Sequence, residues 1–337
     1  MHLIMLSGGS GQRLWPLSGD VKAKQFLKLL KNEHGESESM VQRVYRQLQM
    51  VGNWDSISVV AGEQQEKELQ EQLHDSVQFI LEPERRDTLP AILLSCAALS
   101  SSGILDEEVI AVMPVDPFVD EDYFRCIQFA ETVLKEQQVE LVLLGAVPVK
   151  PSEKYGYIIP TEQKSDYKKY ATFSVNCFKE KPSLVQAQEL MEQGALWNCG
   201  VFVLKLHYIK EIAKELYDIT DFSYENIYQN FSQFERISFD YAVVEKAKNI
   251  KVVKYEGEWK DLGTWETLTE EISQKVSGKA VLDDLCQNVC IVNETDIPVI
   301  AMDMQDVVIA VSKKGILVTN KGQSYRLKEM IQKLNDL

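Results

Sequence analysis

The sequence lacks any apolar run near the ~20 residues that a helix needs to cross a bilayer. Residues 1–11 are apolar but few, with neither the basic leader nor the small-residue cleavage site of a signal peptide. They are typical of a first strand. We therefore expect a cytoplasmic protein that binds no membrane.

Residues that bind transition metals or act as nucleophiles are few. The six cysteines show no CxxC spacing, and most stand in apolar stretches, as free buried thiols of a reducing cytoplasm do. The four histidines are scattered, and none stands beside a cysteine or another histidine at metal-ligand spacing. This pattern disfavours a zinc site and a Ser-His-Asp triad. Catalysis would then depend on carboxylates and cations.

Basic residues are outnumbered, because 36 Lys and Arg face 51 Asp and Glu, for a net charge of −15. Such a surface repels phosphate polymers, so we expect no nucleic-acid partner. A small phosphorylated ligand is still compatible with this charge if a few local cations hold it. The composition, with 45% hydrophobic and 26% charged residues, is typical of a globular protein with a sizeable core.

Short apolar runs alternate with helical patterns through the first half of the chain. The predicted strands are His2–Leu6, Ser56–Ala61, Val77–Leu81, Val109–Met113 and Glu140–Ala146. The predicted helices are Met40–Met50, Glu63–His74, Thr88–Ser101 and Asp120–Gln137. This alternation predicts an α/β fold with a mostly parallel, Rossmann-like mixed sheet flanked by helices. Ligands of such sheets bind beyond the carboxyl ends of the strands.

The second half begins with longer connections and then changes to short β-rich pieces. Strands at Ala171–Phe178 and Ala195–Lys205, and a helix at Ser238–Lys248, continue the first sheet without a linker. We predict one domain of residues 1–274 and a small β-rich domain of residues 275–337, which ends in a helix near Leu327–Leu334. The β-rich repetition is too irregular to predict a solenoid.

A glycine-rich segment follows the first predicted strand and carries Gly8, Gly9 and Gly11 directly after Leu6. Glycines let a backbone approach an anion closely and point amide N–H groups at it. The segment is not a P-loop, since GxxxxGK[ST] is absent. It also fails the dinucleotide fingerprint, because Leu14 stands at the third glycine position. That failure disfavours a dehydrogenase.

Cations follow the glycines closely, at Arg13, Lys22 and Lys24. On an acidic chain, this cluster is what neutralisation of a triphosphate needs. Two carboxylates complete the pattern. Asp116 follows the apolar strand Val109–Met113, and Asp261 follows another apolar run. Alone, each aspartate is more often a cap or turn residue. As a pair they would form a Mg²⁺ site, since Mg²⁺ takes one or two carboxylates plus phosphate oxygens.

Seven motifs in order, from Leu3 to Trp265, resemble those of the sugar-1-phosphate nucleotidyltransferases, and specifically the mannose-1-phosphate guanylyltransferases. The first is GGSGQRLWPLS with the following KQFL. The others are Glu82–Ala91, Tyr155–Ile158, Phe178–Pro182, Trp197–Gly200, Ser238–Lys246 and Trp259–Trp265. Some family members carry an isomerase domain after these motifs, and we expect none here.

The resemblance implies a reaction in which GTP and mannose 1-phosphate form GDP-mannose and pyrophosphate. The sugar phosphate would attack the α-phosphorus in line, with Mg²⁺ as the cofactor. That oxygen is already ionised at neutral pH, so the reaction needs positioning and charge neutralisation and no general base. The scarcity of histidine fits this chemistry.

The resemblance also implies a role for each matching residue. The implied catalytic residues are Arg13, Lys24, Asp116 and Asp261, the two aspartates being the metal ligands. The implied nucleotide-binding residues are Leu6, Gly8, Gly9, Gly11, Arg13, Glu82 and Thr88. The implied sugar-phosphate-binding residues are Gly156, Glu180, Lys181 and Asn198.

Three positions depart from the family pattern. Pro117 replaces a histidine after the aspartate, Asp87 replaces an asparagine, and Leu89 replaces an alanine. These changes leave open another nucleoside triphosphate or another sugar 1-phosphate. They also leave open an inactive, nucleotide-sugar-binding regulator, although the implied catalytic residues are all present. The sequence leaves a homodimer open as well.

Overall fold

The computed structural model describes residues 1–9, 12–19, 22–74, 77–164, 167 and 169–336. The strands are β1 His2–Leu6, β2 Leu30–Lys31, β3 Ser37–Glu38, β4 Ser56–Gly62, β5 Gln78–Glu82, β6 Val109–Pro114, β7 Pro117–Phe118, β8 Leu141–Ala146, β9 Tyr157–Lys164, β10 Thr172–Lys179, β11 Leu196–Lys205, β12 Ile250–Tyr255, β13 Lys260–Asp261, β14 Val276–Ser277, β15 Ala280–Leu282, β16 Cys290–Asn293, β17 Val299–Ala301, β18 Val307–Ser312 and β19 Gly315–Asn320.

The α-helices are α1 Met40–Val51, α2 Glu66–Leu73, α3 Thr88–Ser101, α4 Glu121–Gln137, α5 Leu184–Glu192, α6 Leu206–Tyr217, α7 Tyr224–Gln229, α8 Trp265–Glu271 and α9 Leu327–Asn335. Shorter helical turns are η1 Gln12–Leu14, η2 Lys24–Phe26, η3 Glu63–Gln65, η5 Phe231–Gln233, the π-helix η6 Asp240–Val244 and η7 Lys321–Arg326.

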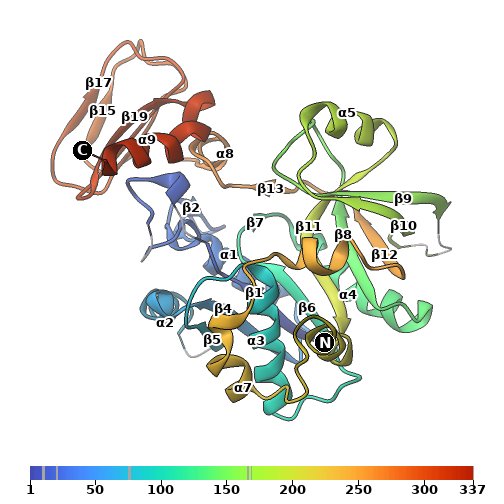
Figure 1. Ribbon diagram of the computed structural model, residues 1–337. Coiled ribbons are helices and arrows are strands. Elements are labelled where there is room, and N and C mark those ends of the chain that lie inside the picture. Colours follow the sequence, from blue (N-terminus) through green and yellow to red (C-terminus); the bar gives the residue numbers. More distant parts are fainter. Residues whose placement is uncertain (10–11, 20–21, 75–76, 165–166, 168, 337) are drawn as a thin grey trace.

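One large sheet forms the centre of the molecule, with the strand order β5-β4-β1-β6-β11-β8-β12-β10-β9 (Figure 1). The four strands β5, β4, β1 and β6 are parallel to one another. Beyond them β11 is antiparallel to both of its neighbours, β6 and β8, and β12 is parallel to β8. The predicted mixed α/β sheet flanked by helices is confirmed.

Helices cover both faces of this sheet because its strands are apolar on both sides. In β1, Leu3 and Met5 join one core cluster, with α1 and α4, whereas Ile4 joins another, with α3 and α6. Successive side chains of a strand point to opposite faces, so an apolar run without alternation needs cover on each. The carboxyl ends of β1, β5 and β6 are thereby left at one edge of a rigid, two-sided core.

Two local predictions from the sequence need correction. The predicted helix Ser238–Lys248 is reduced to the five-residue π-helix η6, a rare wide turn that often occurs at functional sites. All six cysteines lie within the described residues and are free, as predicted, but Cys177 is exposed and only four are buried. Among the described residues, no helix is long and apolar enough to cross a membrane.

The C-terminal strands form a small coil with two sheets. Strands β14, β16 and β18 are parallel neighbours in one sheet, and β15 and β17 are parallel in the other. The chain therefore alternates between two sheets as it advances, which is the path of a solenoid. The sequence did not predict it because the segments between successive strands differ in length. Val289, Ile291 and Ile309 are among the side chains that fill the coil.

This coil packs against residues 14–17, which follow Arg13. Leu14 and Leu17 share a core cluster with Trp265 of α8 and with β16 and β18. The Ser312 hydroxyl donates to the Pro16 carbonyl at 2.8 Å, and the Trp265 indole donates to the Trp15 carbonyl at 3.1 Å. The stretch that follows Arg13 is therefore held in place by α8 and by the C-terminal coil.

Gly278 offers a test of the coil. Its φ is +81°, and an added Cβ would lie 1.9 Å from the Asn293 carbonyl oxygen. Gly194 is the matched control, because its φ is +78° but an added Cβ meets no described atom within 4 Å. We expect Gly194→Ala to lower the free energy of unfolding by about 1 kcal/mol, through backbone strain alone. Gly278→Ala adds a clash with backbone, and we expect a loss above about 3 kcal/mol.

Urea unfolding of both variants measures this difference. Equal losses for Gly278→Ala and Gly194→Ala would show that the coil can relax around an added methyl group.

Candidate active site

A larger cavity of about 470 Å³ and a smaller one of about 260 Å³ adjoin at the carboxyl ends of β1, β5 and β6. Both are lined by Lys24, Pro114, Asp116, Gly200 and Asp240. The larger is also lined by the predicted residues Arg13, Gly156, Glu180, Lys181, Asn198 and Asp261. The smaller is also lined by the predicted residues Leu6, Gly8, Gly9, Glu82 and Thr88. Gly11 lies outside the described residues.

The ammonium group of Lys24 sits between two carboxylates. Its Nζ lies 2.7 Å from Asp116 Oδ2 and 2.9 Å from Asp261 Oδ1. The aspartates are distant in sequence, and the short antiparallel pairing of β7 with β13 brings them together, with Asp261 opposite Pro117. Pro117, which stands where the family has a histidine, is therefore part of β7, one of the two strands that hold Asp116 and Asp261 together.

Charge dominates at this position. Burial would lower the pKa of Lys24, but the charges of Asp116 and Asp261 outweigh burial and raise it. Burial would likewise raise the pKa of Asp261, but Lys24 outweighs it and holds that pKa below its ordinary value. Two carboxylate oxygens therefore already share one cation here, and oxygen is the donor that Mg²⁺ prefers. This donor set fits a divalent metal.

Gln25 ties η2, the turn that carries Lys24, to Ser7 at the end of β1. The Gln25 side-chain amide donates to the Ser7 carbonyl at 2.6 Å and to the Ser7 hydroxyl at 3.0 Å. The residue follows Lys24 directly, so the same turn places the cation and fixes the loop. The motif KQFL contained Gln25, but nothing in the sequence alone assigned it this contact.

Glu82 ends β5 and points into the smaller cavity. It is only 4% exposed, and within the described part of the chain no hydrogen bond to its carboxylate is found. Burial raises its pKa to about 7, with the charge of Arg85 opposing that shift and the charge of Asp87 adding to it. An added Cβ on Gly8 would lie 3.3 Å from Glu82 Oε2, so the glycine-rich segment runs close beside it.

The start of α3 forms another wall of the smaller cavity. Asp87 departs from the family pattern, and its carboxylate accepts from the Thr88 backbone N–H at 2.7 Å as the cap of α3. The Thr88 hydroxyl accepts from the Phe239 backbone N–H at 2.8 Å. Both side chains are therefore engaged within the protein, and Thr88 ties α3 to the turn that begins η6.

The larger cavity is built on close approaches between strands. An added Cβ on Gly156 would lie 2.5 Å from Glu180 Oε2 and 2.7 Å from the Phe178 ring, so a larger residue there would displace both side chains. Lys181 Nζ lies 2.6 Å from Glu180 Oε1, and the charge and hydrogen bond of Glu180 raise the pKa of Lys181 against the opposing effect of burial. The cavity thus presents a carboxylate and an ammonium group side by side.

Asn198 reaches this cavity through an irregularity in β11. The pairing of β11 with β8 shifts register between Asn198 and Phe202, and Gly200 has a φ of +69°. Such bulges re-aim side chains next to active sites. The Asn198 side chain accepts from the Gly200 N–H at 3.1 Å and donates to Asp240 Oδ1 at 2.7 Å.

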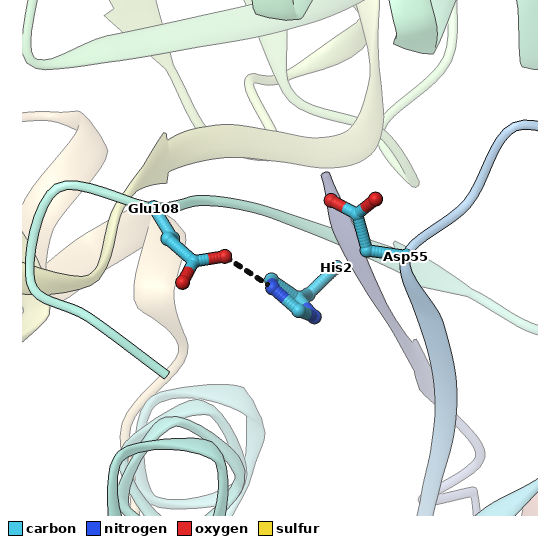
Figure 2. A group of neighbouring side chains, drawn as sticks. All are labelled: His2, Asp55 and Glu108. Carbon is cyan, nitrogen blue, oxygen red and sulfur yellow. Dashed lines mark hydrogen bonds and ion pairs between the residues drawn. The ribbon is translucent and has the colours of Figure 1, made fainter. Parts of the chain in front are cut away.

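A separate group of possible metal ligands, His2, Asp55 and Glu108, lies at the opposite, amino-terminal edge of the strands (Figure 2). Their ligand atoms lie within 4.8 Å of one another. Both ring nitrogens of His2 are already hydrogen-bonded, to Glu108 at 2.7 Å and to Ser56 at 2.8 Å, and the Met1 amino group pairs with Asp55. The sequence did not indicate this group, because the three residues are brought together only by the parallel pairing of β1 with β4 and β6.

A sequence model of the nucleotidyl transferase family matches residues 2–277. The chain belongs to the nucleotidyl transferase family. It is 30% identical to a mannose-1-phosphate guanylyltransferase of Escherichia coli, over 98% of this chain and 75% of that protein. It is also 30% identical to one of Klebsiella pneumoniae, over 98% of this chain and 73% of that protein.

The fold is similar to a solved structure from Thermus thermophilus named mannose-1-phosphate geranyltransferase. The TM-score is 0.79, the identity 26%, and 99% of both chains is covered. The predicted resemblance is therefore confirmed. The protein is a sugar-1-phosphate nucleotidyltransferase, an enzyme of nucleotide-sugar biosynthesis. Its substrates are nucleotides and sugar phosphates, and such enzymes generally use a divalent metal.

The raised pKa of Glu82 predicts a pH-dependent gain for Glu82→Gln. The folded protein holds a proton at this carboxyl up to a pH of about 7, whereas the ordinary pKa is 4.5. Below pH 4.5 this carboxyl group is protonated in the folded and the unfolded protein, so it costs the fold nothing. As the pH rises from 4.5 through 7, the unfolded protein releases the proton first, and the free energy of unfolding falls. We expect wild type and variant to match near pH 4.5, and the variant to be more stable by up to ~3 kcal/mol at pH 8.

Thermal unfolding at several pH values measures this gain. The exposed Glu71 on α2 supplies the control, and Glu71→Gln should show no such trend. A Glu82→Gln difference that is constant from pH 4.5 to pH 8 would contradict the assigned pKa.

Proposed function

We propose that this nucleotidyltransferase transfers a guanylyl group from GTP to mannose 1-phosphate, forming GDP-mannose and pyrophosphate. The observation that carries the proposal is a pair of adjoining cavities with a buried carboxylate in one, a carboxylate–ammonium pair in the other, and Lys24 between them. The relatives named mannose-1-phosphate guanylyltransferase support the choice of base and sugar.

The smaller cavity suits guanine because of Glu82. The Watson–Crick edge of guanine offers two adjacent donors, N1–H and the N2 amino group, which one carboxylate accepts together. Adenine and cytosine each offer an amino group beside an acceptor, and uracil offers a single N–H. The buried carboxylate lacks a hydrogen bond within the described part of the chain, so a base that supplies two donors gains most.

The larger cavity suits a sugar phosphate. Lys181 offers a charge for the phosphate, and Glu180 and Asn198 offer partners for ring hydroxyls. Gly156 lets the Glu180 carboxylate lie against the backbone at the cavity wall, since an added Cβ there would be 2.5 Å from Glu180 Oε2.

The chain's own residues would then position and neutralise the reacting phosphates. The sugar phosphate is its own nucleophile, so no side chain has to remove a proton. Arg13, which is exposed and lines the larger cavity, and Lys24 would offset repulsion between the two anions. Asp116 and Asp261 would hold the Mg²⁺ ion, which supplies further neutralisation of phosphate charge when bound.

Pyrophosphate release tests the proposal, with GTP, ITP, ATP, UTP, CTP and dTTP each paired with several hexose 1-phosphates. We expect GTP with mannose 1-phosphate to give the highest kcat/KM. ITP lacks the N2 amino group, so wild type should prefer GTP to ITP by at least ~10-fold, and Glu82→Gln should reduce that preference. A higher kcat/KM with another triphosphate or another hexose 1-phosphate would identify a transferase of different specificity. Pyrophosphate release with none of the substrate pairs would support an inactive, nucleotide-sugar-binding regulator.

The metal site gives a second prediction. We expect Asp261→Asn to lower kcat by about 10²–10³-fold, the usual loss when one charge-stabilising group is removed. The variant should also bind Mn²⁺ more weakly than wild type in the presence of GTP, which titration calorimetry measures directly.

His2→Gln is the control for that experiment, because it alters the other cluster of metal-type ligands (Figure 2). It should leave Mn²⁺ affinity and kcat near wild-type values. Loss of Mn²⁺ binding in His2→Gln together with normal binding in Asp261→Asn would move the metal to the amino-terminal edge of the sheet.

A further inference from the structure

Asp240 lies where the two cavities meet, and the reaction described above gives it no role. It begins the π-helix η6 and lines both cavities. Its Oδ1 accepts from the Asn198 side-chain amide at 2.7 Å. A carboxyl group that lines the sugar-phosphate cavity beside Asn198 is in reach of a substrate bound there.

The turn that carries Asp240 is held by both cavity walls. The Phe239 N–H donates to Thr88 Oγ1 at 2.8 Å, and the Leu89 N–H donates to the Ile237 carbonyl at 3.2 Å. The Phe239 ring is buried and lies 4.7 Å from the ring of Phe202 on β11. Asp240 is therefore fixed relative to α3 on one side and β11 on the other, as a group that selects a substrate by geometry must be.

The surroundings of Asp240 favour a neutral carboxyl group. Burial raises its pKa to about 7, and the charge of Glu180 adds to that rise, whereas the Asn198 amide and Lys181 oppose it. Among the charged groups that line the cavities with it are Glu180, Lys181, Lys24 and Asp116. A protonated carboxyl group donates one hydrogen bond and accepts others, which matches a sugar hydroxyl that does both.

Glu180 and Asp240, two of the carboxyl groups that line the larger cavity, thus differ in their hydrogen-bonding partners. Glu180 is paired with Lys181 and can only accept. Asp240 has no cation beside it in the ion pairs of the described residues, and Asn198 engages one of its oxygens. The carboxyl group also accepts from its own backbone N–H, so what it can offer a substrate is the proton of its neutral form and the lone pairs that these two contacts leave.

We propose that Asp240 determines sugar specificity, by exchanging hydrogen bonds with one ring hydroxyl of the hexose 1-phosphate beside Glu180 and Asn198. This inference rests on the proposed function, since it needs a hexose 1-phosphate in the larger cavity. A site built to bond a hydroxyl discriminates strongly against analogues that lack it, because its own polar group is then left unpaired.

Kinetics with mannose 1-phosphate and its 2-, 3-, 4- and 6-deoxy analogues test the proposal. We expect Asp240→Ala to raise KM for mannose 1-phosphate at least ~10-fold, with KM for GTP changed by less than ~2-fold. In wild type, the analogue that lacks the contacted hydroxyl should lose at least ~10-fold in kcat/KM, and in Asp240→Ala that same analogue should lose nothing further.

Two more variants separate recognition from folding. Asp240→Asn keeps a donor and an acceptor of the same shape, so it should recover most of the selectivity. Asp284→Asn, exposed on the C-terminal coil, should behave as wild type.

An equal loss on every deoxy analogue in Asp240→Ala, or an equal rise in KM for GTP, would overturn the inference and leave Asp240 a structural residue. If wild type accepts no hexose 1-phosphate at all, the proposed function itself fails. If wild type is active and Asp240→Ala shows no coupling with any deoxy position, only the role of Asp240 fails.

Discussion

The ion pairs of Lys24 with Asp116 and Asp261 are the interaction on which the site depends. Two carboxylates held this close repel each other, and partial burial strengthens the repulsion because less water screens it. One ammonium group cancels much of that repulsion, so the cavities can form before a substrate is present. Lys24 lies in η2, Asp116 lies between β6 and β7, and Asp261 lies in β13, so this contact also joins three distant parts of the chain.

A lysine suits that position better than an arginine would. Its ammonium group is a point charge on a flexible stem, whereas a guanidinium group would hold a carboxylate through two bonds in a fixed geometry. Asp116 and Asp261 would hold a divalent cation, and the Lys24 stem is long and flexible enough to offer its charge to a phosphate. The same side chain would then stabilise the site without substrate and neutralise phosphate charge when substrate is bound.

The site contains many carboxyl groups although its proposed substrates are both negatively charged. Glu82, Glu180 and Asp240 each have different surroundings. Glu82 is buried beside Gly8, and Glu180 is close against Gly156, so a glycine backbone brings each carboxylate to its cavity wall. Asp240 lies between them, and burial favours its neutral form. On the proposed function, Glu82 would accept from the base, Glu180 would accept from the sugar and Asp240 could donate to it, while the cations would lie near the phosphates.

The sequence predicted the parts of the fold that local patterns determine. Continuous apolar runs gave strands such as β1 and helix α3 within a residue of their observed bounds, because burial on both faces requires apolar side chains throughout. The distance between Asp116 and Asp261 could not be predicted, since the pairing of β7 with β13 involves two residues on each strand. Asp240 was missed because a helical period does not reveal a π-helix.

The C-terminal coil shows the same limit at a larger scale. Its strands have the apolar pattern of short β-segments, but only their parallel pairing identifies a solenoid, and connections of unequal length hide that pairing in the sequence. The docking site was equally hidden. An added Cβ on Gly315 would lie 2.7 Å from the Trp15 ring, so the backbone next to the β18–β19 turn packs directly against that ring.

This docking has a consequence for the reaction. Gln25 ties η2 to Ser7, the Trp15 carbonyl accepts from Trp265 of α8, and the Pro16 carbonyl accepts from Ser312 of the coil. Arg13 and Lys24 stand on either side of the docked stretch, so the positions of both cations depend on contacts made by residues about 250 positions or more away. On the proposed function the coil would contribute to phosphate binding although none of its described residues lines either cavity, because charge neutralisation requires the cations to be held in place as much as to be present.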